Sequence, residues 1–218
     1  MGTITRTFAN NITTSGVFKP TAFNNASFDN VTAVPEGAVE GGNMVLLSTQ
    51  TASASASISF TTGIDSTYKE YMFIFNNIHP ATTANFTFQV NASGQTGFNE
   101  TITSTVFRAQ HTESGSTASL DYKTNLDQAQ GTSYQVIGEQ ISAGSDESCS
   151  GKLHLFEPSS DTFVKHFMTN FSGYVDGTTS HNNFTAGYIN NTSAITEIDF
   201  KMSSGNIDAG TIQMFGIL

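Results

Sequence analysis

Histidine is the side chain in this sequence best suited to acid–base chemistry near neutral pH. The chain contains five: His79, His111, His154, His166 and His181. A Ser–His–Asp hydrolase needs one of them beside an activated serine, but no serine lies in a G-x-S-x-G motif. No two histidines have the spacing of metal ligands. The surrounding patterns place His154 and His166 in strands, His79 at a strand end, and His111 and His181 in polar loops. We therefore expect structural roles for all five.

Carboxylates are the second set of side chains that could do chemistry. Six of them fall in predicted loops, where they could join asparagines in a calcium site: Asp121, Asp127, Asp146, Glu147, Asp161 and Asp176. No D-x-[DN]-x-[DN]-G run supports such a site, so solvated loop acids are the better interpretation. The carboxylate pair of a glycosidase depends on a separation set by the fold, but acids are few and there is no Trp to stack on a sugar. We predict no catalytic, metal or cofactor-binding residues and expect that the protein is not an enzyme.

Cys149 is the single cysteine, so it cannot form an internal disulfide. No basic residue lies closer in sequence than Lys152, and a thiol without a nearby positive charge has no clear source of a lowered pKa. We expect a small buried or half-buried side chain.

Composition narrows the class of partner. The 218 residues carry a formal net charge of −10, with only eight Lys and Arg, which are scattered singly. Nucleic acids and anionic membranes attract proteins through clustered positive charge, so we expect neither as a partner. No apolar run resembles a signal peptide or reaches transmembrane length, and we expect the chain to fold in a cytoplasm.

Apolar residues recur along the chain with a period of two and not 3.6, and this pattern predicts strands. Ser, Thr, Asn and Gly clusters separate the strands and supply the turns. The predicted strands are Met44–Ser48, Ser55–Thr61, Tyr71–Ile78, Asn85–Val90, Thr103–Ala109, Ser133–Gly138, Ser150–Phe156, Phe163–Phe171, Asn183–Ile189, Ile195–Met202 and Gly210–Gly216.

Most of these strands alternate large apolar with small polar residues, which indicates one buried and one wet face. The run Tyr71–Phe75 is apolar on both sides, so we expect it at the centre of a sheet with a further layer or a partner subunit over its second face. Strand number and spacing predict an all-β, jelly-roll-like antiparallel β-sandwich over residues 43–218, with an up-and-down barrel as the alternative. The loop Gly205–Ala209 is expected to join the last two strands as a hairpin.

Residues 1–42 differ from this pattern because their apolar side chains are isolated in a background of Thr and Asn. They are too few for a core of their own but enough to dock on another surface. We predict an extended N-terminal arm with a Gly-rich hinge; the alternative is that this segment supplies the first strands of the sandwich. The predicted partner-contact residues of the arm are Phe8, Val17, Phe18, Phe23, Phe28 and Val31.

Three segments resemble virion proteins of marine tailed bacteriophages, such as the phages of cyanobacteria and pelagic bacteria: Leu46–Pro80, Lys152–Tyr174 and Ala186–Leu218. The arm segment Thr7–Phe18 is similar to an N-terminal segment of such proteins, and together the segments cover about half of the chain. The resemblance implies a structural place in the virion and no catalytic residues.

Two roles fit this resemblance. The first is a capsid decoration or cement protein, a homotrimer made in the host cytoplasm that binds the major capsid protein on the capsid surface through its arm. Multivalent attachment would then stabilise the head. The alternative is a tail or head fibre whose β-sandwich binds a host glycan through the predicted loops Thr112–Gln130 and Gly173–Asn182.

Overall fold

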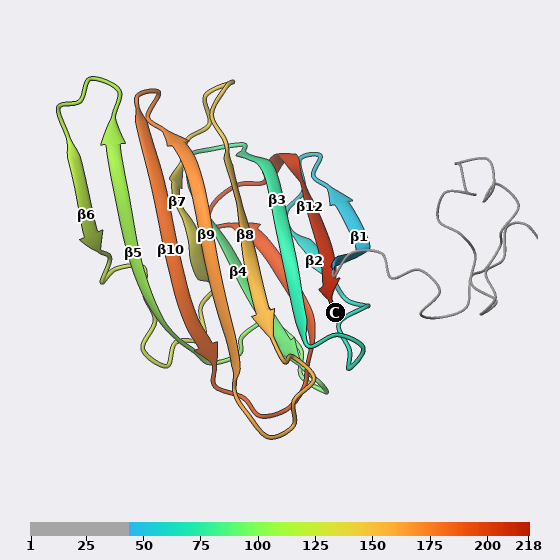
Figure 1. Ribbon diagram of the computed structural model, residues 1–218. Coiled ribbons are helices and arrows are strands. Elements are labelled where there is room, and N and C mark those ends of the chain that lie inside the picture. Colours follow the sequence, from blue (N-terminus) through green and yellow to red (C-terminus); the bar gives the residue numbers. More distant parts are fainter. Residues whose placement is uncertain (1–43) are drawn as a thin grey trace, which may run out of the picture. The chain divides into compact units, whose positions relative to one another are not determined.

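The computed structural model describes residues 44–218, and these fold entirely into strands and their connections (Figure 1). The predicted arm, with its six apolar contact residues, lies outside the described residues. The strands are β1 (Met44–Thr51), β2 (Ile58–Phe60), β3 (Glu70–Pro80), β4 (Ala84–Ala92), β5 (Ile102–Thr112), β6 (Ala118–Tyr122), β7 (Gln135–Ile141), β8 (Cys149–Phe156), β9 (Lys165–Val175), β10 (Thr179–Ile189), β11 (Ile195–Met202) and β12 (Ile207–Ile217).

The strands form two sheets. The large sheet has eight strands in the order β1-β12-β3-β8-β9-β10-β5-β6, and the small sheet has four in the order β2-β11-β4-β7. All pairs within them are antiparallel. In Figure 1 the large sheet runs across the front, and β7, β4 and β2 lie behind it. The predicted all-β antiparallel sandwich is therefore confirmed, and the alternative of one closed sheet is wrong for residues 44–218.

All eleven predicted strands are present, and one additional strand, β6, was missed. The hairpin predicted at Gly205–Ala209 is wrong, because β11 belongs to the small sheet and β12 to the large one. The intervening chain crosses from one sheet to the other. A true tight hairpin joins β9 to β10 through Asp176 and Gly177, whose φ angles of 54° and 62° give the primed turn that matches the strand twist.

The core is aromatic and lies between the sheets. On β3, Tyr71, Phe73 and Phe75 alternate toward the small sheet and are at most 1% exposed. The Phe75 ring centroid lies 5.5 Å from that of Phe86 on β4 and 5.0 Å from that of Phe200 on β11, both in edge-to-face geometry. Edge-to-face aromatic pairs add to the stabilisation that burial provides. The two sheets are thus joined at the point where β3 crosses β4 and β11.

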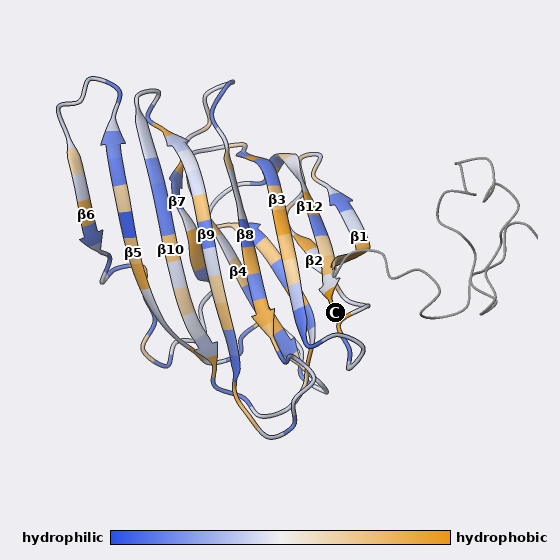
Figure 2. Ribbon diagram, in the orientation of Figure 1, coloured by the Kyte–Doolittle hydropathy of each residue, from blue (hydrophilic) through white to orange (hydrophobic). Residues whose placement is uncertain are grey.

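Beyond this core the interior becomes polar. Figure 2 shows apolar residues along β3 and a polar start to β10. On the inner side of β5, Arg108 Nη1 lies 2.6 Å from Glu139 Oε2 of β7, and Lys123 Nζ lies 3.0 Å from Glu139 Oε1. Arg108 is opposite Asn183 of β10 in the strand register. One buried carboxylate therefore pairs with two cations, and a second carboxylate, that of Asp121, lies 4.0 Å from Arg108 Nη2.

We predict that Glu139→Gln lowers the free energy of unfolding by about 3–5 kcal/mol, because it leaves two cations without their shared carboxylate in a buried site. Glu157→Gln is the matched control: Glu157 pairs with Lys69 at 3.1 Å, but both side chains are more than half exposed. That control is expected to cost less than about 1 kcal/mol. Urea unfolding followed by circular dichroism measures both, and equal midpoints for the two variants would contradict the prediction.

Candidate interaction surface

The histidines occupy separate positions in the sandwich. His79 donates through Nδ1–H to the Glu147 carbonyl oxygen at 2.7 Å, and His154 Nδ1 is hydrogen-bonded to Glu70. The predictions for His79, His154 and His166 as strand residues hold. The loop predictions for His111 and His181 are wrong, since the first lies near the end of β5 and the second lies in β10. His181 is 4% exposed, because the inner side of β10 is polar and buried.

The other chemistry-bearing residues are also dispersed. Cys149 is the first residue of β8, and burial raises the pKa of its thiol to about 12, as expected of a small buried side chain. Asp121 lies in β6 and not in a loop. Glu147 is buried and accepts hydrogen bonds from the backbone N–H groups of Gly144 and Gly177 at 2.6 and 2.5 Å. Residues 44–218 contain no group of three or more His, Cys, Asp or Glu placed to hold a metal ion.

The two predicted contact loops of the fibre alternative differ from the structure. The range 112–130 contains the short strand β6 but otherwise lies mostly outside strands, as predicted. The range 173–182 consists of the end of β9, the three connecting residues 176–178 and the start of β10, so most of it is paired strand and not a loop.

The most extensive candidate surface is the side of the large sheet that faces away from the small sheet. Side chains on a strand alternate between faces, and the buried residues of β3, β8, β9 and β12 point into the core. Their neighbours in sequence therefore point outward. The strand register aligns these outward residues across the sheet in a first row of Ala186, Met168, His154, Met72, Phe215 and Leu46.

Two further rows flank the first. One contains Tyr188, His166, Phe156, Glu70, Ile217 and Met44. The other contains Tyr122, Phe107, Phe184, Asn170, Lys152, Ile74, Gln213 and Thr49. We refer to these three rows together as the outer apolar face. Glu70 and Lys152 are the only Asp, Glu, Lys or Arg residues in the three rows.

Several side chains of the outer apolar face are exposed to a degree unusual for their size. Leu46 is 52% exposed, Met168 56% and Tyr122 54%. Phe107 and Phe184 stack on each other with ring centroids 4.8 Å apart, which places a flat aromatic pair on the surface. Such a surface gains free energy by leaving water, so it is suited to contact with another apolar surface.

A hollow of about 460 Å³ lies in this face at the ends of β8 and β10 and the starts of β5 and β9. Phe156, His166, Met168 and Tyr188 line it, together with the small residues Ala186 and Gly187. The rings of His166 and Tyr188 meet edge-on with centroids 6.2 Å apart. The lining is mostly apolar, which suits an apolar side chain.

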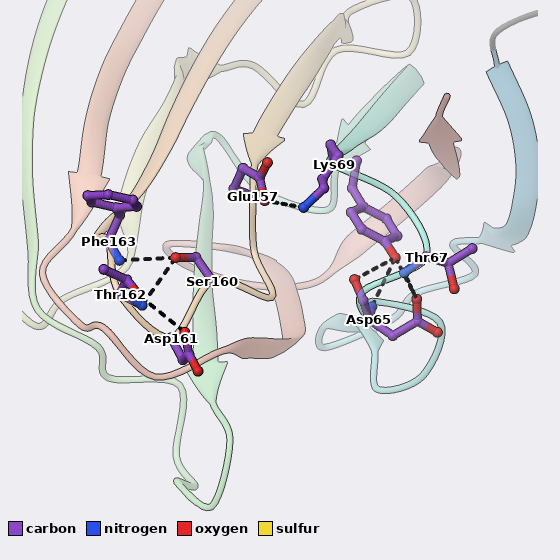
Figure 3. Close-up of polar contacts among 9 residues, drawn as sticks. Asp65, Thr67, Lys69, Glu157, Ser160, Asp161, Thr162 and Phe163 are labelled. Atoms are coloured by element: carbon purple, nitrogen blue, oxygen red, sulfur yellow. Dashed lines mark hydrogen bonds and ion pairs between the residues drawn. The ribbon is translucent and has the colours of Figure 1, made fainter.

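Next to the hollow, the loop 157–164 joins β8 to β9 and presents Phe163, which is 73% exposed. Figure 3 shows how Ser160 holds this loop: its Oγ accepts hydrogen bonds from the backbone N–H groups of Phe163 at 3.0 Å and Thr162 at 3.2 Å. Ser160 in turn donates its backbone N–H to the Glu157 carbonyl oxygen at 3.0 Å. The exposed aromatic side chain is therefore carried by an ordered turn.

A second, smaller hollow of about 300 Å³ has a different lining. Ser148, Ser150, Ser172, Ser180 and Tyr174 surround it, so hydroxyl groups and one aromatic ring meet there. This combination can hydrogen-bond to and stack on a polar ligand such as a sugar.

The buried charges near β5 and β7 were missed by sequence reasoning as a group. This region contains the ion pairs of Glu139 with Arg108 and Lys123. It also contains three buried polar atoms that have no hydrogen-bond partner among residues 44–218: Arg108 Nε, His181 Nδ1 and Asn183 Nδ2. Burial and the nearby Arg108 guanidinium lower the pKa of His181, although Glu139 and Asp176 act in the opposite direction. The lowered pKa favours the neutral form of His181.

Comparison with known proteins gives no relative. No protein-family model matches the chain, and neither the curated proteins nor the solved structures include a detectable match. No helix in residues 44–218 has the length and hydropathy needed to span a membrane.

We predict that His181 makes the fold less stable in mild acid. Because its pKa in the folded protein is lowered below the ordinary histidine value of about 6.5, the unfolded chain takes up a proton first as the pH falls below about 6.5. The stability contributed by neutral His181 is present above that pH and declines below it, by at most about 1.4 kcal/mol per pH unit.

Urea unfolding between pH 7.5 and 5 of the wild type and His181→Asn measures this contribution as a difference in slope. His111→Asn, at an exposed position, is the control and is expected to keep the wild-type slope. An unchanged slope in His181→Asn would show that another group governs the acid response.

Proposed function

We propose that this protein is a structural component of a tailed-bacteriophage virion, and specifically a decoration protein on the outside of the capsid. In this role residues 1–42 bind the major capsid protein, and the sandwich forms a rigid body above it. The observation that carries the proposal is the outer apolar face. Proteins that act alone in water rarely expose a contiguous apolar surface of this kind, whereas proteins that assemble with neighbours do.

Two further observations support an adhesive role. Within residues 44–218 the side chains that could do chemistry are dispersed, whereas the exposed apolar side chains are concentrated on one face. The sequence segments Leu46–Pro80, Lys152–Tyr174 and Ala186–Leu218 resemble virion proteins. Contacts of modest area hold a shell well when each copy touches several subunits, because the second contact forms at high effective concentration.

We also infer that the sandwich is a jelly roll with two inserted hairpins. When β5–β6 and β9–β10 are set aside, four strands remain in each sheet: β1-β12-β3-β8 and β2-β11-β4-β7. Successive strands of this set alternate between the sheets except for β4 and β7, which pair with each other in the small sheet, and this is the pattern of a rolled-up Greek key. The insertions both widen the large sheet and so enlarge the outer apolar face.

The first test is the copy number of the protein relative to the major capsid protein in purified virions, measured by quantitative mass spectrometry. A decoration protein follows the head lattice, so we expect a ratio close to that of the shell protein. A ratio far below it would contradict decoration of the head.

The role of the arm in attachment is tested in the full-length chain. Two of its aromatic residues are replaced together, Phe18→Ser and Phe23→Ser, and binding to capsid shells that lack the protein is measured. Aromatic side chains dominate the binding energy of many interfaces, and their loss is expected to weaken binding by about 30-fold or more. Leu218→Ser, which removes an apolar side chain that is 75% exposed in the sandwich, is the control. Unchanged binding by the arm variant would exclude the arm as the attachment segment.

The second candidate is a tail or head fibre that binds a host glycan, and the serine-lined hollow is the observation that favours it. Its four serines and Tyr174 offer the hydroxyl and aromatic groups with which proteins bind sugars. A low copy number in virions together with glycan-array binding that is lost in Tyr174→Ala would support this role over decoration.

A further inference from the structure

We propose that a second copy of this chain pairs with the outer apolar face, and that Phe163 of each copy enters the apolar hollow of the other. The proposal goes beyond the virion role and does not rest on it, since it follows from residues 44–218 alone. It assigns a partner to the side of the large sheet that faces away from the small sheet.

The size of the face matches what a stable pair needs. Two of the three rows cross six strands and the third crosses all eight, so the face holds 20 outward residues. At about 4.8 Å between strands and about 7 Å between rows, these residues cover on the order of 670 Å². Specific protein interfaces bury roughly 600–1,000 Å² on each partner, and one face against one face falls within this range.

Charge favours the same arrangement. Two chains that each carry a net charge of −10 repel each other over most of their surfaces. The three rows contain one acidic and one basic residue, Glu70 and Lys152, and Glu70 is hydrogen-bonded to His154. The outer apolar face is thus the broad surface on which two copies approach without burying like charges.

Phe163 and the hollow provide a specific contact within this face. The loop that carries Phe163 directly connects Phe156 and His166, which both line the hollow. Phe163 does not line the hollow of its own chain, and its side chain is 73% exposed. Because Ser160 holds the loop, little conformational freedom is lost when the ring is buried.

A projection and a hollow that lie next to each other on one surface suit twofold symmetry. In such an isologous interface, residue i of one copy contacts residue j of the other, and the reverse contact occurs at the same time. Each Phe163 ring would meet Met168, Tyr188 and Phe156 of the facing copy. Two aromatic anchors, one on each side of the axis, then fix the register of the pair.

Sedimentation equilibrium of the full-length protein tests the proposal up to about 100 µM, a range that covers weak and strong interfaces. We expect the mass of two chains. Met168→Lys places an unpaired charge at the centre of the face, and Phe163→Ser removes the anchor. Each is expected to raise the dissociation constant about 30-fold or more, as for residues that dominate an interface.

Thr62→Lys is the matched control for the added charge, because Thr62 is exposed in the connection that follows β2 of the small sheet. It is expected to leave the dissociation constant within about twofold. Circular dichroism of every variant checks that the sandwich is retained. A monomeric wild type at the highest concentration, a mass of three chains, or wild-type association of both face variants would each overturn the pairing.

A photo-crosslinking amino acid at position 163 identifies the occupant of the hollow directly. We expect a product of twice the chain mass, with the crosslink mapped by mass spectrometry to residues 156, 166–168 or 186–188. A crosslink within a single chain to residues 1–42 would assign the face to the arm in place of a second copy, and would refute the proposal.

Discussion

The structure depends on the packing of phenylalanine rings between two sheets of unequal width. Phe75 of β3 contacts Phe86 and Phe200 of the small sheet and also Phe171 of β9, whose ring centroid is 4.9 Å away. Four strands can cover the inner side of only part of an eight-stranded sheet. The aromatic contacts therefore fix where the small sheet lies, and the other features of the sandwich follow from what it covers and what it leaves uncovered.

The width difference accounts for the polar interior beneath β5 and β10. These strands lie beyond the aromatic cluster, and their inner residues include Arg108, His181 and Asn183. Glu139 of β7 pairs with both Arg108 and Lys123 there. A buried ion pair of this kind contributes less net stability than apolar packing, but it penalises any register in which one charge lacks its partner. The cluster thus specifies how β5 and β10 dock on the small sheet.

Sequence predicted the strands well because each has a local period of two, and it also indicated that Tyr71–Phe75 has a second apolar side in need of a cover. It missed β6, since Ala118–Tyr122 is five residues long with one aliphatic residue, Leu120, between Ser and Asp. Sequence reasoning also predicted that β11 and β12 form one hairpin, because a local pattern does not show which sheet a strand belongs to. The hollow and the three rows were not predictable, because they arise from the register of strands far apart in sequence.

The edges of the sheets offer a less suitable route to assembly than the outer apolar face. Exposed strand edges can pair with other chains unless they are short or irregular. Here the edge strands β2 and β6 have three and five residues, and β1 has a register shift between Leu46 and Ser48. β7 pairs with β4 through two register shifts. Because the edges are short or irregular and the outer apolar face is broad and nearly uncharged, association is directed to the face. A contact between two faces can end with two copies, whereas pairing between edges could continue as a chain of sheets.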